Sequence, residues 1–157
     1  IHMAINVSLV QFRDPHFLAR LRSALDESGI PPERVELEIT ESVAMLEADT
    51  VIGILAELKA MGIQIAIDDF GTGFSSLAYL HRLPIDRLKI DRTFVRDLDA
   101  NGSSGASIAQ TVIGLGRSLG LSVIAEGVET EAQARLLMEM GCPLAQGFLY
   151  SRPVDAH

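Results

Sequence analysis

The chain alternates short apolar stretches, rich in β-branched residues, with longer segments whose apolar residues recur at helical spacing. The short stretches predict strands at residues 3–8, 34–40, 63–69, 86–91, 122–127 and 143–149. The longer segments predict helices at residues 17–29, 40–62, 75–83, 107–120 and 130–141. Because this alternation is typical of parallel strands joined by helical crossovers, the chain is predicted to be an α/β protein.

Local signals refine the ends of these elements. Asp14 followed by Pro15 predicts an N-cap and the first position of the first helix. Gly29 and Gly62 predict the ends of the first two helices. The polar stretch at residues 97–106 is rich in glycine and serine, so we expect a mobile loop there.

Two α/β architectures are compatible with this pattern, a doubly wound sheet and a (β/α) barrel. The sequence contains neither GxGxxG nor GxxxxGK[ST], which disfavours the nucleotide-binding doubly wound folds. Every predicted strand carries a polar residue at or near its carboxyl end. These residues are Asn6, Glu38, Asp68, Asp69, Lys89, Asp91, Glu126 and Gln146. In a barrel the strand ends meet on one face, where active sites of that fold lie, so the barrel is favoured.

The number of predicted strands is too small for a closed barrel. A complete (β/α)8 barrel takes about 250 residues, whereas this chain has 157 residues. We therefore expect a TIM-like (β/α) barrel of which only a C-terminal portion with about six strands is present. Residues 1–157 are predicted to form a single domain that lacks its N-terminal strands.

Composition narrows the possible partners and the compartment. The net charge of −8 argues against electrostatically driven binding of a nucleic-acid polymer. A single cysteine, Cys142, excludes an internal disulfide and fits a reducing cytoplasm, where we expect it to be a small buried residue. No apolar run is long enough to span a bilayer and no secretory signal is visible, so we expect a cytoplasmic segment without membrane contact.

The polar residues at the strand ends have a common chemistry. Five of them are carboxylates, which would repel one another strongly if they were left unneutralised. An all-oxygen set suits Mg²⁺ or Mn²⁺ rather than zinc. The adjacent Asp68 and Asp69 could serve two ions about 3.5–4 Å apart, the spacing that clamps a phosphoryl group. Taken singly, each residue could instead be a turn, cap or salt-bridged strand end, but their recurrence on successive strands favours a metal site.

Six motifs identify a family. NVS, ELEITE, IDDFGTGFSSL, LPIDRLKID, AEGVET and QGFLYSRP occur in this order. Over essentially all 157 residues the chain resembles the EAL domains, which are barrel phosphodiesterases. The resemblance implies hydrolysis of cyclic di-GMP to linear pGpG with Mg²⁺ or Mn²⁺ at a two-metal site. It also implies a homodimer and, in the full protein, fusion to sensory or diguanylate-cyclase-like domains.

The resemblance assigns a role to each matching position. Asn6, Glu38 and Asp68 match metal ligands, and Asp69 matches the carboxylate of the second metal. Lys89 matches the lysine near the nucleophilic water, and Glu126 matches a catalytic carboxylate that is assigned as base or metal ligand. Further matches are Gln146 as a polar residue lining the substrate site, Glu41 as the anchor of the loop at residues 70–73, and Asp91 and Glu129 as supporting acids. That loop links metal binding to dimerisation in the family.

The sequence departs from the family at one point, because the name-giving Glu-Ala-Leu strand upstream of NVS is absent. Its glutamate is a metal ligand in the family, so two readings stay open beside the enzyme. One is a catalytically inactive, EAL-like module that binds cyclic di-GMP as a receptor. The other is an enolase-like barrel with carboxylates on Mg²⁺ and a lysine base, which the paired Asp68 and Asp69 disfavour.

Overall fold

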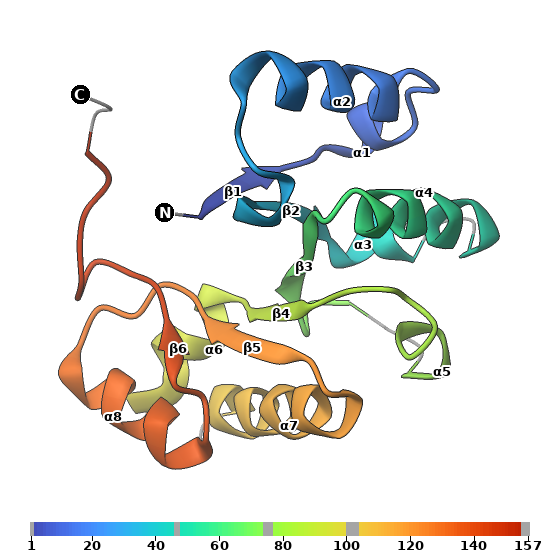
Figure 1. The fold of residues 1–157 in the computed structure, drawn as a ribbon. Coiled ribbons are helices and arrows are strands. Elements are labelled where there is room, and N and C mark those ends of the chain that lie inside the picture. The colour runs from blue at the N-terminus through green and yellow to red at the C-terminus, as the bar shows by residue number, and fades with distance from the viewer. Residues whose placement is uncertain (1, 46–47, 74–76, 100–103, 155–157) are drawn as a thin grey trace. The chain divides into compact units, whose positions relative to one another are not determined.

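The computed structural model describes residues 2–45, 48–73, 77–99 and 104–154. Contacts within the chain divide it into two compact units. The first unit comprises Ile1–Asp68 and Gly73–Asp86, and the second comprises Asp69–Thr72 and Arg87–His157. Each unit is described separately below, with element labels as in Figure 1.

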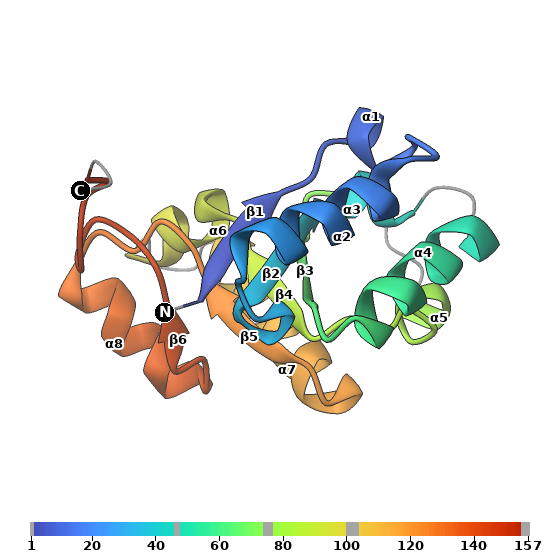
Figure 2. The ribbon, with the colours of Figure 1, turned by 45° about the horizontal axis from the view of Figure 1, so that its top comes forward.

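The first unit is built on parallel strands. Its strands are β1 (Met3–Asn6), β2 (Val35–Thr40) and β3 (Gln64–Phe70), the last of which continues into the second unit. Its helices are α1 (Leu9–Phe12), α2 (Phe17–Ser28), the 3-10 turn η1 (Pro32–Arg34), α3 (Glu41–Ala44), α4 (Ala48–Ala60) and α5 (Leu77–Leu80). β1 pairs with β2 and β2 with β3, in each case in parallel. Figures 1 and 2 both show α2 and α4 as neighbours, and Arg22 of α2 pairs with Glu57 of α4 at 3.6 Å.

The second unit repeats the same construction. Its strands are β4 (Arg87–Ile90), β5 (Ser122–Ala125) and β6 (Leu144–Ala145). Its helices are α6 (Arg92–Arg96), the 3-10 turn η2 (Asp97–Asp99), α7 (Ser104–Leu119) and α8 (Glu131–Met140). β4 pairs with β5 and β5 with β6, again in parallel. α7 runs along β5 (Figure 1) and contacts both β4 and β5.

The core of the first unit lies on β2 and β3, as expected for strands covered on both faces. Leu37, Ile39, Ile65 and Ile67 are all almost completely buried. Burying each of these side chains contributes about 1.5–3 kcal/mol. This apolar core makes the two strands a rigid support for the polar residues at their ends.

The helix signals are partly confirmed. Gly29 ends α2 in the left-handed conformation with φ 66, and Gly62 lies just beyond α4 with φ 91. The predicted N-cap at Asp14 is wrong, because α2 begins at Phe17. Asp14 instead accepts a hydrogen bond from the backbone N–H of His16 at 2.9 Å and forms an ion pair with Arg20.

Three predicted boundaries also change. The first strand ends at Asn6, because Ser8 and Gln11 form a capping box that begins the short helix α1. The predicted helix at residues 40–62 is two helices, α3 and α4, with residues 46–47 between them outside the described part of the chain. The last strand, predicted over residues 143–149, is only Leu144–Ala145 long.

The polar stretch at residues 97–106 is largely helical where the structure describes it. η2 covers Asp97–Asp99 and α7 begins at Ser104, while residues 100–103 lie outside the described residues. Gly105, in the first turn of α7, affects how closely this helix packs. A Cβ atom there would lie 2.8 Å from the carbonyl oxygen of Phe94, so the glycine allows α7 to approach α6 closely.

Candidate functional site

The first unit presents polar residues at the ends of its three strands. Asn6 is the register partner of Glu38, and Asp68 is the partner of Thr40. Because side chains alternate along a strand, this register places Asn6, Glu38 and Asp68 on the same face of the sheet, with Asp68 two residues further along. Glu38 is buried with 7% exposure, Asp68 is half-buried and Asn6 is exposed. The register therefore puts three of the predicted residues on one face within this unit.

Glu41 is tied to the glycine loop, as the sequence predicted. It is the first residue of α3 and is 4% exposed. Its carboxylate accepts a hydrogen bond from the backbone N–H of Gly73 at 3.2 Å. A Cβ atom at residue 73 would lie 2.9 Å from Oε1 of Glu41, so a glycine is needed for this close contact. Residues 74–76, which follow this loop, lie outside the described residues.

The second unit brings Lys89 and Glu126 together. Lys89 is 4% exposed, and its Nζ lies 2.6 Å from Oε1 of Glu126, whose side chain is 21% exposed. Lys89 is the register partner of Ile124, so Glu126, two residues later, lies on the same face. The backbone N–H of Glu126 donates to the carbonyl of Ile90 at 3.1 Å, which extends the strand pairing to this residue.

Asp69 and Asp91 form a second polar pair in this unit. Their side chains lie beside each other, and both residues are half-buried. Burial raises the pKa of Asp91, but the hydrogen bonds from the hydroxyl and the backbone N–H of Thr93, together with the contact to Asp69 and the charge of Arg92, outweigh it. The pKa of Asp91 therefore lies below its ordinary value. Asp91 is thus an ionised group beside Asp69.

Thr93 is a supporting residue that the sequence analysis missed. Asp91 is the N-cap of α6, and its Oδ1 accepts a hydrogen bond from the backbone N–H of Thr93 at 2.8 Å as well as one from the Thr93 hydroxyl. The Asp-Arg-Thr sequence at residues 91–93 is an N-cap signal that could have predicted this short helix.

The remaining two predicted residues behave differently from each other. Gln146 is exposed and continues the pairing of β6, because its backbone N–H donates to the carbonyl of Ala125 at 2.8 Å. The backbone of Gln146 is therefore paired with the residue that precedes Glu126. Glu129 is exposed, and among the described residues its carboxylate makes no ion pair or hydrogen bond. Its backbone N–H donates to Oε1 of Gln133 at 2.9 Å, which ties it to the start of α8.

The polar side chains at the strand ends have the oxygen atoms that a hard divalent cation prefers, but they are not arranged as a ready metal site among the described residues. Within residues 2–45, 48–73, 77–99 and 104–154, no three His, Cys, Asp or Glu side chains are close enough to hold a metal ion. The residues at the strand ends nevertheless offer carboxylate and amide oxygens, the ligands that Mg²⁺ and Mn²⁺ prefer.

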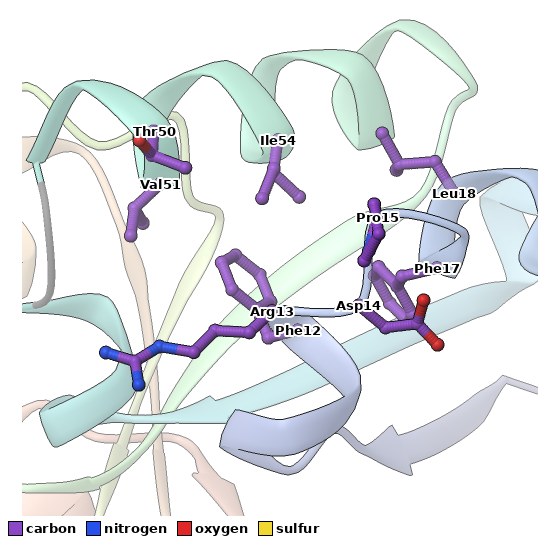
Figure 3. Close-up of a pocket in the computed structure, with 9 residues that line it drawn as sticks. All are labelled: Phe12, Arg13, Asp14, Pro15, Phe17, Leu18, Thr50, Val51 and Ile54. Atoms are coloured by element: carbon purple, nitrogen blue, oxygen red, sulfur yellow. The ribbon is translucent and has the colours of Figure 1, made fainter.

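An apolar cavity of the first unit lies away from these residues. It has a volume of about 470 Å³ and is lined by Phe12, Arg13, Asp14, Pro15, Phe17, Leu18, Thr50, Val51 and Ile54. Figure 3 shows the ring of Phe12 pointing toward Ile54, with Arg13 along one edge. None of the residues predicted for the site lines this cavity.

Comparison with known proteins decides the family. The model of the EAL domain matches residues 1–153. The chain belongs to the EAL-domain family. A similar relative is the bifunctional diguanylate cyclase/cyclic di-GMP phosphodiesterase MucR of Pseudomonas aeruginosa, 48% identical over 155 residues. The cyclic di-GMP phosphodiesterase NbdA of the same organism is 42% identical over 154 residues.

Solved structures agree with this assignment. The PaMucR phosphodiesterase in complex with c-di-GMP superposes with a TM-score of 0.95 at 48% identity, covering 99% of this EAL chain and 62% of that chain. A manganese/cyclic di-GMP complex of Klebsiella pneumoniae BlrP1 gives a TM-score of 0.85 at 36% identity, covering 97% and 39%. The predicted fold class, an incomplete TIM-like (β/α) barrel, is therefore confirmed.

The EAL chain covers only part of its curated relatives. The alignment with MucR covers 99% of this chain but only 22% of MucR. The alignment with NbdA covers 98% of this chain but only 20% of NbdA. In the described part of the chain, no helix is both long and apolar enough to cross a membrane.

Proposed function

We propose that this EAL chain is part of a metal-dependent phosphodiesterase that hydrolyses cyclic di-GMP to linear pGpG. The observation that carries the proposal is the buried Lys89–Glu126 pair, at 2.6 Å, at the carboxyl ends of β4 and β5. The curated relatives MucR and NbdA are described as cyclic di-GMP phosphodiesterases, which supports the same reaction here.

The proposed cofactor is Mg²⁺ or Mn²⁺ at a two-metal site. Its ligands would be Asn6, Glu38, Asp68, Asp69 and Glu126. When bound, two such ions neutralise phosphate charge and lower the pKa of a coordinated water. The manganese complexes of BlrP1 support this choice.

The chain's own residues would bind and orient the reactants. Lys89 stays protonated next to the carboxylate of Glu126, because an opposite charge favours its charged form. It therefore positions the attacking water or stabilises the negative charge of the transition state, and it does not act as a base. Glu126 orients Lys89 and holds a proton released from the water. Gln146, exposed beside Glu126, contacts the substrate.

The compartment, the oligomeric state and the fused domains are also proposed from the family. The chain would be a portion of an EAL domain that acts in the cytoplasm as a homodimer. It would be fused to sensory or diguanylate-cyclase-like domains. The bifunctional description of MucR and the small share of that protein that the chain covers support the fusion.

The direct test is to incubate the full-length protein that contains this chain with cyclic di-GMP and Mn²⁺ and to quantify pGpG. We expect pGpG to form, to disappear when the metal is removed with a chelator, and to return when Mn²⁺ is restored. Asp68→Asn and Glu38→Gln should each abolish the product without unfolding the protein, since each removes one ligand charge.

The alternative is a receptor module that binds cyclic di-GMP without cleaving it. Solved relatives in complex with cyclic di-GMP, such as PaMucR, support the nucleotide binding that this alternative shares with the enzyme. Tight binding of cyclic di-GMP with no pGpG at saturating Mn²⁺ would establish the receptor and exclude the phosphodiesterase.

A further inference from the structure

The backbone at the end of β3 and just beyond it has an unusual conformation. Asp69 has φ 54, the only positive φ of a non-glycine residue in the described chain, and Gly71 has φ 100. A left-handed conformation is uncommon for a residue with a side chain, so the surrounding structure must hold it. Thr72 contributes to the turn, because its hydroxyl donates to the carbonyl of Asp69 at 2.9 Å.

The ring of Phe94 occupies the space next to Gly71. A Cβ atom on Gly71 would lie 3.1 Å from Cε2 and 3.7 Å from Cζ of Phe94, and 3.3 Å from Cγ2 of Ile108. The side chains of Phe94 from α6 and Ile108 from α7 therefore fill the space beside Gly71. Phe94 is only half-buried, although its ring makes this contact.

The helix that carries Phe94 is itself held on several sides. Its N-cap, Asp91, lies beside the side chain of Asp69. The backbone carbonyl oxygen of Phe94 lies against Gly105 of α7, where an added Cβ atom would be 2.8 Å from it. Arg92 lies against Gly127, with its Cβ only 2.6 Å from the place of a Cβ on that glycine. The same helix thus contacts the backbone after β3 and the backbone after β5.

We propose that Phe94 is a positioning residue for Asp69. Its ring blocks movement of Gly71 and so keeps the turn at residues 69–72 in the conformation that presents the Asp69 carboxylate. Asp91 lies beside the Asp69 side chain, whereas Phe94 acts through the backbone alone. This inference rests on the proposed function, in which Asp69 is a ligand of the second metal.

The first test measures Mn²⁺ affinity by calorimetry in the full-length protein, together with kcat and KM for cyclic di-GMP. Phe94→Ala should weaken Mn²⁺ binding by about 10-fold, the smaller loss typical of removing a group that orients a metal ligand. It should lower kcat more than it raises KM. Phe94→Leu, which keeps a large apolar side chain, should recover most of the affinity.

The matched control is Phe17→Ala. Phe17 is also a half-buried phenylalanine in a helix, but it belongs to the first unit and lines the cavity near α4. It should lower the midpoint of thermal unfolding without changing Mn²⁺ affinity. If Phe94→Ala lowers the unfolding midpoint yet leaves Mn²⁺ affinity and kcat at wild-type values, Phe94 is merely structural and the proposal is wrong.

A double-mutant cycle with Gly71→Ala isolates the contact. In wild-type protein the added methyl group meets the Phe94 ring, so Gly71→Ala should weaken Mn²⁺ binding. In the Phe94→Ala background that clash is removed, so the further loss from Gly71→Ala should be smaller, a non-additivity typical of residues in contact. Additive losses would overturn the inference. Wild-type protein that binds Mn²⁺ but forms no pGpG would contradict the proposed phosphodiesterase alone, whereas wild-type protein that binds no Mn²⁺ would contradict both.

Discussion

Lys89 is a charged side chain in an almost completely buried position. Taking an ammonium group out of water is costly unless a counter-charge lies close, and Glu126 at 2.6 Å supplies it. A buried ion pair is weak support for stability, since apolar residues would do as well. In the proposed function, the place of Lys89 at the end of β4 follows from the charge that it would present to the substrate.

Replacing this lysine should therefore affect chemistry more than binding. We expect Lys89→Ala to lower kcat by about 10²–10³-fold, the loss typical of one group that stabilises transition-state charge. The dissociation constant of cyclic di-GMP, measured with Ca²⁺ in place of Mn²⁺, should change little. Single-turnover kinetics with the unchanged wild-type rate would refute this role.

The chain offers a matched control for that variant. Lys59 also pairs with a carboxylate at 2.6 Å, that of Asp86, which in addition accepts the backbone N–H of Ile65. This pair and the hydrogen bond tie Asp86 to α4 and β3 within the first unit. Lys59→Ala should lower thermal stability but leave kcat unchanged.

Glu41 is the second residue whose effect should be indirect. Glu41→Ala removes the acceptor of the Gly73 N–H, so residues 70–73 lose their anchor to α3. We expect reduced turnover and altered dimerisation in the full-length protein, measured by pGpG formation and light scattering. Glu57→Ala, at an exposed pair with Arg22, is the control. Wild-type turnover and wild-type dimerisation in Glu41→Ala would count against the anchor role.

At the scale of an element, the connection from β5 to α8 depends on Gly147. A Cβ atom at this residue would lie 2.2 Å from the carbonyl oxygen and 2.3 Å from the nitrogen of Val128. These are backbone atoms, which cannot move aside as a flexible side chain can. The segment that follows Glu126 is therefore packed directly against the segment that follows Gln146.

Gly147→Ala should thus destabilise the protein by at least 2 kcal/mol, roughly the upper range for a single substitution. The matched control is Gly114→Ala in α7, where no atom lies within 4 Å of the added Cβ. Because alanine favours a helix over glycine, this variant should be stabilised by about 0.5–1 kcal/mol. Urea denaturation measures both, and equal effects of the two substitutions would show that the close contact at Gly147 is unimportant.

At the scale of the whole molecule, part of the apolar surface is uncovered. Every residue of β1 is exposed, including Met3 at 46% and Ile5 at 38%, and α2 has no fully buried residue. A strand with an open edge is a template for pairing with another chain. The 157 residues expressed alone should therefore associate rather than stay a monomer.

Light scattering of the isolated 157-residue polypeptide tests this expectation. We expect a mass above 17.0 kDa, and a shift toward the monomer when both Met3 and Ile5 are changed to glutamate. The substitution should not affect α7 or β5, whose amide exchange serves as an internal control. A monodisperse monomer of 17.0 kDa with full phosphodiesterase activity would contradict the expectation.

Much of the fold could be predicted from sequence, and so could the positions of the polar residues at the strand ends. The six strands follow from short apolar runs between helical patterns, and this signal is local. Asn6, Glu38 and Asp68 could be assigned to one face because side chains alternate along strands, and the register confirms it. The family motifs added residue roles that no periodicity contains.

Other features were decided only by the tertiary structure. Four-residue helices such as α1 have too few turns for a periodic signal. Asp14, predicted as an N-cap, instead forms an ion pair with Arg20. The contact of Phe94 with Gly71 joins residues 23 positions apart, and only folding brings them together. Sequence alone determined which chemical groups stand at the strand ends, because those are set by local pattern. Which of them touch was decided by packing between distant segments, because contact depends on the three-dimensional path of the chain.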